Sequence, residues 1–133
     1  MKILIADPPN IEAIKARFAI RPEDRVIFTY GDTIYNPGGH PIEQNPDLIA
    51  HEEVHTRQQG SDPAGWWERY LIDDSFRLNQ EIEAYRTQYR KFKTMTRDRQ
   101  AIAMLAHNIA KVLSGHIYGN IIDYYEARQR IKA

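Results

Sequence analysis

Short apolar runs and helically spaced apolar residues follow one another at the start of the chain. The run KILIA at residues 2–6 predicts a short strand. Asp7 is suited to cap a helix that opens at the two prolines 8–9, because proline is well tolerated in the first helical turn. The apolar residues of this helix recur at helical spacing: Ile11, Ile14 and Phe18. We therefore expect one face of the helix to pack inward.

Residues 26–36 carry the only clear hairpin signal. β-branched and aromatic residues dominate residues 26–30 and 33–36, and Gly31-Asp32 between them suits a two-residue turn. The segment 37–41, rich in proline and glycine, then ends the second strand.

The rest of the chain has a helical pattern. Asn45 and Pro46 start a helix that Gly60 ends, and Asp62 and Pro63 start the next one. The expected helical segments are residues 46–59, 66–92 with an interruption near 73–74, 98–113 and 120–131. The fold class is therefore α+β, a mainly helical single domain over residues 1–133 with one small sheet.

Composition narrows the choice of partners. The chain has 133 residues, enough for one modest core, and 18 basic residues balance 18 acidic ones. A net charge of zero argues against nucleic acid and against an anionic membrane surface, because both reward a positive excess. The cationic stretch 89–100 is expected to be a solvated helix end and loop.

Cysteine is absent, so disulfides and thiolate metal sites are excluded. Any metal must be held by His, Asp or Glu, and five histidines are available. The N-terminal apolar run is too short for a signal peptide, and no apolar run approaches the roughly 20 residues of a membrane span. We expect a soluble, cytoplasmic protein.

The stretch HEEVH at residues 51–55 lies in the middle of a predicted helix. Residues four apart on a helix lie about 40° apart around its axis and about 6 Å along it, so His51 and His55 could share one ion. Glu52, about 100° round the helix, cannot easily join them but can reach a water bound to that ion. This is the pattern H-E-x-x-H of zinc hydrolases, in which the glutamate is the general base. The competing interpretation is a surface helix with incidental His and Glu. Glu53 points away and is expected to be solvated.

Zinc needs a third protein ligand, which must come from elsewhere in the chain. The remaining histidines, His40, His107 and His116, are candidates, but the best signal is EIEAY at residues 81–85. Glu81 and Glu83 lie 200° apart on a helix, so only one can face the site. Ala84 on the Glu81 side permits close approach of two helices, which favours Glu81. Glu83 is expected to be an exposed ion-pair partner or an acceptor that supports a ligand.

HEEVH followed by EIEAY resembles the gluzincin class of zinc metallopeptidases. The second motif is similar to the E-x-E-A-D of prenyl-protein and heat-shock-type membrane zinc peptidases, whose first glutamate binds zinc and corresponds to Glu81. Tyr85 stands where that motif has its aspartate, a departure that leaves the support of the ligands to Asp73, Asp74 or Glu83. The segment LSGHIYGNIIDYYEA resembles small metallopeptidase-like proteins of phage and prophage genomes.

The resemblance implies a zincin-like domain with a small antiparallel sheet beside the metal-binding helix. It also implies that a strand of residues 26–36 pairs with an extended substrate; the alternative is that this hairpin only roofs the core. Hydrolysis further requires a donor to the developing oxyanion, for which Tyr118 and His116 are candidates. Trp66 and Trp67 are expected to fill the core or line a cleft.

The sequence thus predicts a zinc-dependent hydrolase, a metallopeptidase acting on a peptide or protein substrate. Its expected zinc ligands are His51, His55 and Glu81, and Glu52 and Tyr118 are its expected catalytic residues. The alternative is a non-catalytic, metal-stabilised binding or assembly protein. A fourth protein ligand, such as His116 or Asp74, would close the site and favour this alternative. A weaker third option is a nucleic-acid accessory factor.

Overall fold

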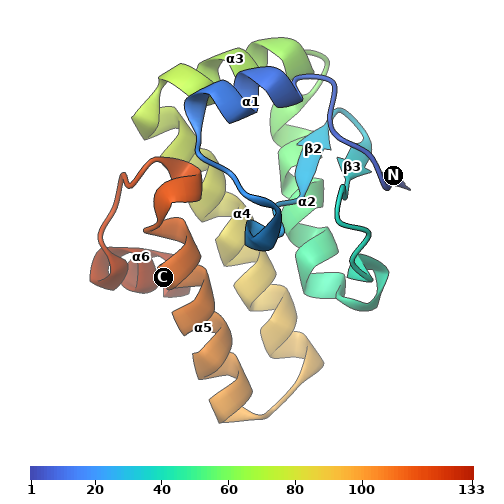
Figure 1. Ribbon diagram of the computed structural model, residues 1–133. Helices are drawn as coiled ribbons and strands as arrows, with labels where there is room; N and C mark the ends of the chain where they lie inside the picture. Colours follow the sequence, from blue (N-terminus) through green and yellow to red (C-terminus); the bar gives the residue numbers. More distant parts are fainter.

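The computed structural model describes all 133 residues and has two helices at its centre, on which the other elements pack. Helix α2 (Pro46–Gln59) packs against α4 (Asp74–Met95), and Ala84 of α4 is completely buried. Helices α5 (Arg99–Leu113) and α6 (Tyr124–Lys132) pack on the other side of α4. Figure 1 shows α4 and α5 descending together as a hairpin below the rest of the molecule.

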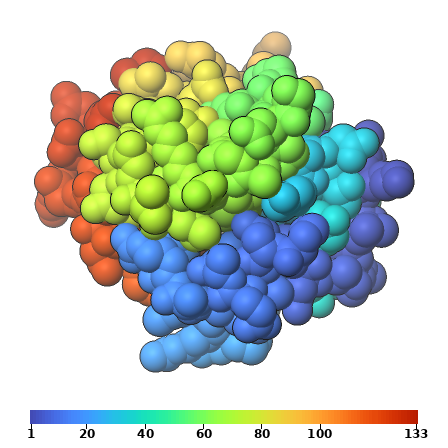
Figure 2. Space-filling view, turned by 90° about the horizontal axis from the view of Figure 1, so that it is seen from above, coloured from blue at the N-terminus to red at the C-terminus, as the bar shows by residue number.

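Two shorter helices cover one end of α2 and α4. Helices α1 (Ile11–Arg17) and α3 (Pro63–Ile72) lie next to one another there, and Nε of Arg17 donates to the carbonyl of Leu71. Figure 2, seen from above, shows α1 in blue and α3 in yellow-green side by side over this face. None of the helices is both long and apolar enough to cross a membrane.

The sheet has three strands in the order β1-β3-β2: β1 (Lys2–Leu4), β2 (Phe28–Tyr30) and β3 (Thr33–Tyr35). The predicted hairpin is confirmed, with β2 antiparallel to β3 and Tyr30 opposite Thr33. Gly31 in the turn has φ +64°, a conformation that favours glycine. The predicted first strand is also present, but it pairs in parallel with β3. The sheet is therefore mixed, and the expectation of an antiparallel sheet is wrong in this respect.

Three of the predicted helix boundaries are set by local features of the chain. Helix α2 ends at Gln59, and Gly60 follows with φ +55°. The side chain of Asp62 accepts from the backbone N–H of Gly65 at the start of α3, and that of Asp73 accepts from Phe76 at the start of α4. The predicted interruption near residues 73–74 is thus a real break between two capped helices.

Two predicted helix starts are wrong. Asp7 does not cap α1, which begins at Ile11 without a side-chain cap. The last helix begins at Tyr124 rather than near Asn120, because the chain first makes the 3₁₀ turn η3 (His116–Tyr118) and Asp123 then caps α6. Asn45 does precede α2, but its side chain donates to the carbonyl of Pro41 instead of capping the helix.

The buried apolar residues form two clusters. One joins α4, α5 and α6 and includes Ile82 and Leu113. The other joins α1, β2 and α3 and includes Phe28 and the two tryptophans, Trp66 and Trp67. Polar residues of α2 and α4 are buried between these clusters, where His51 lies against Tyr85 of the first and His55 against Trp66 of the second.

Candidate metal centre

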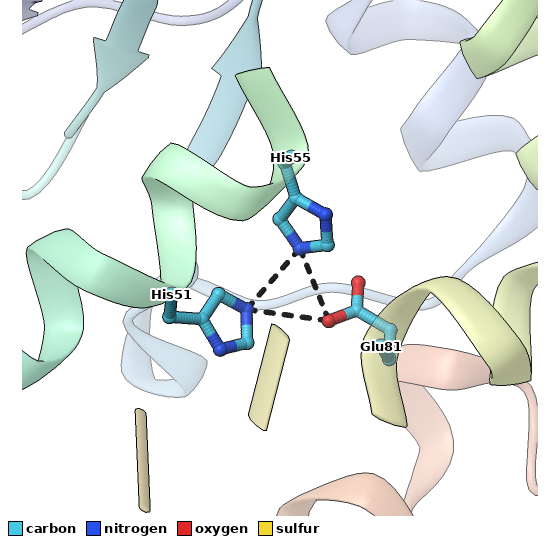
Figure 3. Close-up of side chains that lie close together, drawn as sticks. All are labelled: His51, His55 and Glu81. Atoms are coloured by element: carbon cyan, nitrogen blue, oxygen red, sulfur yellow. Dashed lines mark hydrogen bonds and ion pairs between the residues drawn. The ribbon is translucent and has the colours of Figure 1, made fainter. Parts of the chain in front are cut away.

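Three donor atoms from two helices meet between the clusters (Figure 3). Nε2 of His51 lies 3.2 Å from Nε2 of His55, and Oε1 of Glu81 lies 3.3 Å from the first and 3.2 Å from the second. The three residues are only 4–5% exposed. They form a buried group that could hold one metal ion, and they are the three ligands expected from the sequence.

The local structure explains why these side chains meet. Helix α2 is unbroken across residues 51–55, so the two imidazoles extend from the same face one turn apart. The fully buried Ala84 lets α4 approach α2 closely, and Glu81, three residues before it, then reaches across. Glu83 lies on the exposed side of α4, as predicted.

Gln58 sets the orientation of His55. Nδ1 of His55 lies 2.8 Å from Oε1 of Gln58, while Nε2 of Gln58 donates to the carbonyl of Gln80 and to the carboxylate of Glu83. Both of these partners can only accept, so the amide oxygen must face His55 and Nδ1 must carry a proton. A neutral His55 therefore presents its lone pair at Nε2, toward the other two donors. Glu83 thus supports a ligand indirectly, one of the two roles expected for it.

Tyr70 holds the other side of Glu81. Its hydroxyl donates to Oε2 of Glu81 over 2.6 Å, so Oε1 is the oxygen that faces the histidines. Sequence reasoning missed both Tyr70 and Gln58. Gln58 could have been found, because it follows His55 by three residues and so shares its helix face. Tyr70 carries no such local signal.

His51 is supported differently. Its Nδ1 is buried without a hydrogen-bond partner, and its ring packs edge-on against Tyr85 at 4.3 Å between centroids. Tyr85 is the residue that replaces the aspartate of the similar motif. The two aspartates proposed to compensate do not: Asp73 caps α4 and Asp74 pairs with Arg77, both away from the ligands. Of the three residues expected to support the ligands, only Glu83 does so, through Gln58.

Glu52 is buried beside the three donors without being one of them. Its Oε2 accepts a hydrogen bond of 2.9 Å from Oγ1 of Thr29 in β2. Burial raises the pKa of the Glu52 carboxyl, and the two nearby histidines oppose that shift only in part. The hydroxyl of Thr29 is thus the one side-chain partner that orients this carboxylate, a contact that sequence reasoning did not predict.

The protein alone holds His55 and Glu81 as an ion pair. Burial disfavours the charged imidazolium of His55, but the adjacent carboxylate of Glu81 outweighs it and raises the pKa of His55 to about 9. Burial likewise disfavours the Glu81 anion, yet His55 and His51 together bring the pKa of its carboxyl far below the usual range.

A narrow cavity borders the site. It is lined by the three donor residues, by Glu52 and by apolar side chains of α1, β2 and α3, including Trp66 and Trp67. Its free volume is about 40 Å³, room for a few water molecules. The tryptophans therefore both fill the core and line a cleft, the two roles expected for them.

Tyr118, a candidate oxyanion donor, lines this cavity. The three histidines outside the donor group do not. The Tyr118 hydroxyl lies 2.6 Å from that of Tyr85, and burial raises the pKa of Tyr118 well above its usual range. The hydroxyl thus stays protonated and can donate. His116 is exposed and pairs with Asp24, while His107 is exposed and contacts Tyr124. His40 lines a different cavity.

The hairpin's outer edge is already occupied at its centre. β2 is the edge strand, and the carbonyl of Thr29 accepts from Nε2 of Gln59 and from Nε1 of Trp67. Oε1 of Gln59 also accepts from the backbone N–H of Gly31, so this side chain clamps α2 to the hairpin. An extended substrate cannot use this carbonyl, which favours the alternative that the hairpin roofs the core.

Comparison of the chain with protein-family models, with curated proteins and with solved structures gives no match. The chemistry of the site must therefore be argued from its own donor atoms.

Proposed function

We propose that the protein is a zinc-dependent hydrolase, a peptidase of the gluzincin type, with zinc held by His51, His55 and Glu81. The observation that carries the proposal is the triangle of donor atoms with edges of 3.2–3.3 Å. Four ligands at about 2.0–2.1 Å from a tetrahedral zinc lie about 3.3 Å apart, so the triangle has the size of one face of that tetrahedron. Two imidazoles and one carboxylate are also a donor set found in catalytic zinc sites.

A zinc ion bound there would polarise the scissile carbonyl and lower the pKa of a water molecule. Glu52 lies in the same cavity and is the only other carboxylate that lines it. Its role is to take a proton from the attacking water and to pass it to the leaving amine. The hydrogen bond from the hydroxyl of Thr29 to Oε2 keeps this carboxylate oriented.

Tyr118 is the proposed donor to the oxygen on which negative charge develops. Its hydroxyl and that of Tyr85 are hydrogen-bonded, and Tyr118 lines the cavity. One of the two hydroxyls donates to the other, which leaves the second proton free to point toward a substrate oxygen.

The second candidate is a binding or assembly protein that uses the metal as a structural pin. The deep burial of all three donor residues favours it. Against it, only three protein donors converge, and the two residues named as possible fourth ligands, His116 and Asp74, are engaged elsewhere. A structural zinc site has four protein ligands, so the three-donor group favours catalysis.

The test combines metal analysis with cleavage of a broad peptide pool read by mass spectrometry. After reconstitution, wild type and Glu52→Gln should each hold about one zinc per chain, and the variant should lose at least about a hundredfold in cleavage rate. Glu53→Gln is the matched control, because Glu53 is the exposed neighbour of Glu52. This variant should cleave peptides like wild type. A wild-type protein that holds no stoichiometric zinc would refute the proposal, and equal cleavage by Glu52→Gln would refute the role of Glu52.

A further inference from the structure

A second cavity, named the outer cavity here, adjoins the metal cavity. It lies between α1, the start of β2, the connection between them and the loop at residues 37–40. Figure 1 shows the connection, residues 18–27, descending from α1 and returning to β2. Its free volume is about 260 Å³, compared with about 40 Å³ for the metal cavity. It is therefore the larger of the two spaces and can hold several side chains.

The two cavities share a wall. Ile20, Val26 and Phe28 line both of them. A peptide segment lying in the outer cavity would thus pack on the same apolar side chains that lie beside Glu52 and the three metal-binding residues. The outer cavity is placed to hold the part of a substrate next to the bond being cleaved.

The rim of the outer cavity is cationic. Lys15, Arg21 and Arg25 line it, against the single carboxylate of Asp7. Lys15 and Arg25 have no carboxylate within 4.0 Å, and Arg21 approaches only Glu23, at 4.0 Å. On a chain of zero net charge, this is a local positive excess without an internal partner.

The 3₁₀ turn before Arg25 places this residue at the cavity. Arg25 follows the 3₁₀ turn η1 (Pro22–Asp24) and has φ +54°, a left-handed conformation that is uncommon for residues other than glycine. Arg25 ends the turn in this conformation, and its backbone N–H donates to the carbonyl of Pro22. Here the conformation belongs to the residue that brings a guanidinium to the cavity rim.

We propose that the outer cavity is a substrate subsite for a peptide segment that bears a carboxylate next to an apolar side chain. The apolar group packs on Ile20, Val26 and Phe28, and the carboxylate pairs with Lys15 and Arg25. The carboxylate belongs either to an acidic side chain or to a free C-terminus. The subsite rests on the proposed peptidase for its purpose, but binding to it does not require turnover.

The experiment measures binding of three fluorescent peptides to zinc-loaded Glu52→Gln protein by anisotropy. The first carries one glutamate among apolar residues and an amidated C-terminus, the second has glutamine in its place, and the third is the glutamine peptide with a free C-terminal carboxylate. Either the glutamate peptide or the free-acid peptide should bind at least about fivefold more tightly than the amidated glutamine peptide. The peptide that binds more tightly shows whether the carboxylate belongs to a side chain or to a C-terminus. The preference should weaken as salt is added.

A double substitution Lys15→Gln with Arg25→Gln should abolish the preference. The matched control is Lys91→Gln with Arg97→Gln, which removes the same charge from exposed positions near the far end of α4. Equal binding of all three peptides, no binding of any of them, or equal loss in the control would overturn the subsite. Failure of the proposed function is recognised separately. If the protein binds no zinc or cleaves nothing but still prefers the carboxylate peptides, the peptidase proposal fails and the subsite stands. If it cleaves peptides without this preference, the subsite fails and the peptidase proposal stands.

Discussion

The hydroxyl of Tyr70 lies 2.6 Å from Oε2 of Glu81, the carboxylate oxygen that does not face the histidines. The carboxylate is thereby held from one side by Tyr70 in α3 and approached from the other by His51 and His55 in α2. Such a partner fixes the direction of a ligand and is worth a measurable share of metal affinity.

Replacing Tyr70 by Phe should therefore weaken zinc binding by about tenfold or more, since outer partners of metal ligands typically contribute that much. The ring would keep its packing against Trp66 and Trp67, so the fold should be retained. Competition with a coloured chelator measures the affinity. Tyr125→Phe is the control, because Tyr125 is 81% exposed, and equal affinities for both variants would contradict the role of Tyr70.

Zinc affinity should rise with pH. His55 carries a proton up to a pKa of about 9 in the protein alone, and a metal can bind only to the neutral ring. Each bound zinc must therefore displace a proton, and the affinity should increase by about tenfold per pH unit below that pKa. Titrations across this range, paired with calorimetry in two buffers, measure both the slope and the released proton. An affinity independent of pH would contradict the His55–Glu81 ion pair.

The free energy of unfolding of the metal-free protein should fall as the pH rises, opposite to the zinc affinity. The pKa of His55 is about 9 in the folded protein and 6.5 for an unperturbed histidine, so the folded state holds an extra proton between these values. The stabilisation is complete below pH 6.5 and is lost as the pH rises through about 9, by roughly 1.4 kcal/mol per pH unit. Glu81 has a lowered pKa, so its contribution is present above 4.5 and is lost in acid.

Urea unfolding in the presence of a chelator checks this pH dependence. The free energy of unfolding should fall between pH 6.5 and about 9, and His55→Gln should remove that slope. A wild-type protein that gains stability over this interval would show that His55 is not held as the cation.

Local patterns predicted those parts of the structure that local forces decide. Asp62 caps α3 through its own side chain, and Gly60 ends α2. The spacing of His51 and His55 follows from helix geometry alone. The choice of Glu81 over Glu83 needed one further idea, that the small Ala84 marks the side of α4 that faces another helix.

The remaining features depend on contacts between distant segments. Thr29 meets Glu52, and Tyr70 meets Glu81, only because the hairpin and α3 pack over α2 and α4. The parallel pairing of β1 with β3 is equally a tertiary contact, and KILIA itself carries no sign of its partner. Asp7 was expected to act as a cap, but the backbone of residues 8–10 does not enter a helix there.

The connection between α1 and β2, residues 18–27, should loosen when His116 is replaced by Ala. Ile20, Val26 and Ile27 of this segment cover the metal cavity. The contact between Nε2 of His116 and Oδ2 of Asp24, at 3.0 Å, is the only side-chain hydrogen bond that ties the segment to a distant part of the chain. Because the pair is exposed, global stability should change by less than about 1 kcal/mol.

Hydrogen–deuterium exchange measures this loosening directly. Amides of residues 20–27 should exchange several-fold faster in His116→Ala, while those of α2 and α4 keep their protection. His107→Ala, which removes another exposed histidine, is the control. Unchanged exchange in residues 20–27 would show that apolar packing alone holds the segment.

The most direct test of the central claim is a crystal structure of zinc-loaded protein with anomalous data collected at the zinc edge. We expect one strong peak at about 2.0–2.1 Å from Nε2 of His51, Nε2 of His55 and Oε1 of Glu81, on the side of the cavity that holds Glu52. A peak at His40, His107 or His116 instead, or none between α2 and α4, would contradict the account.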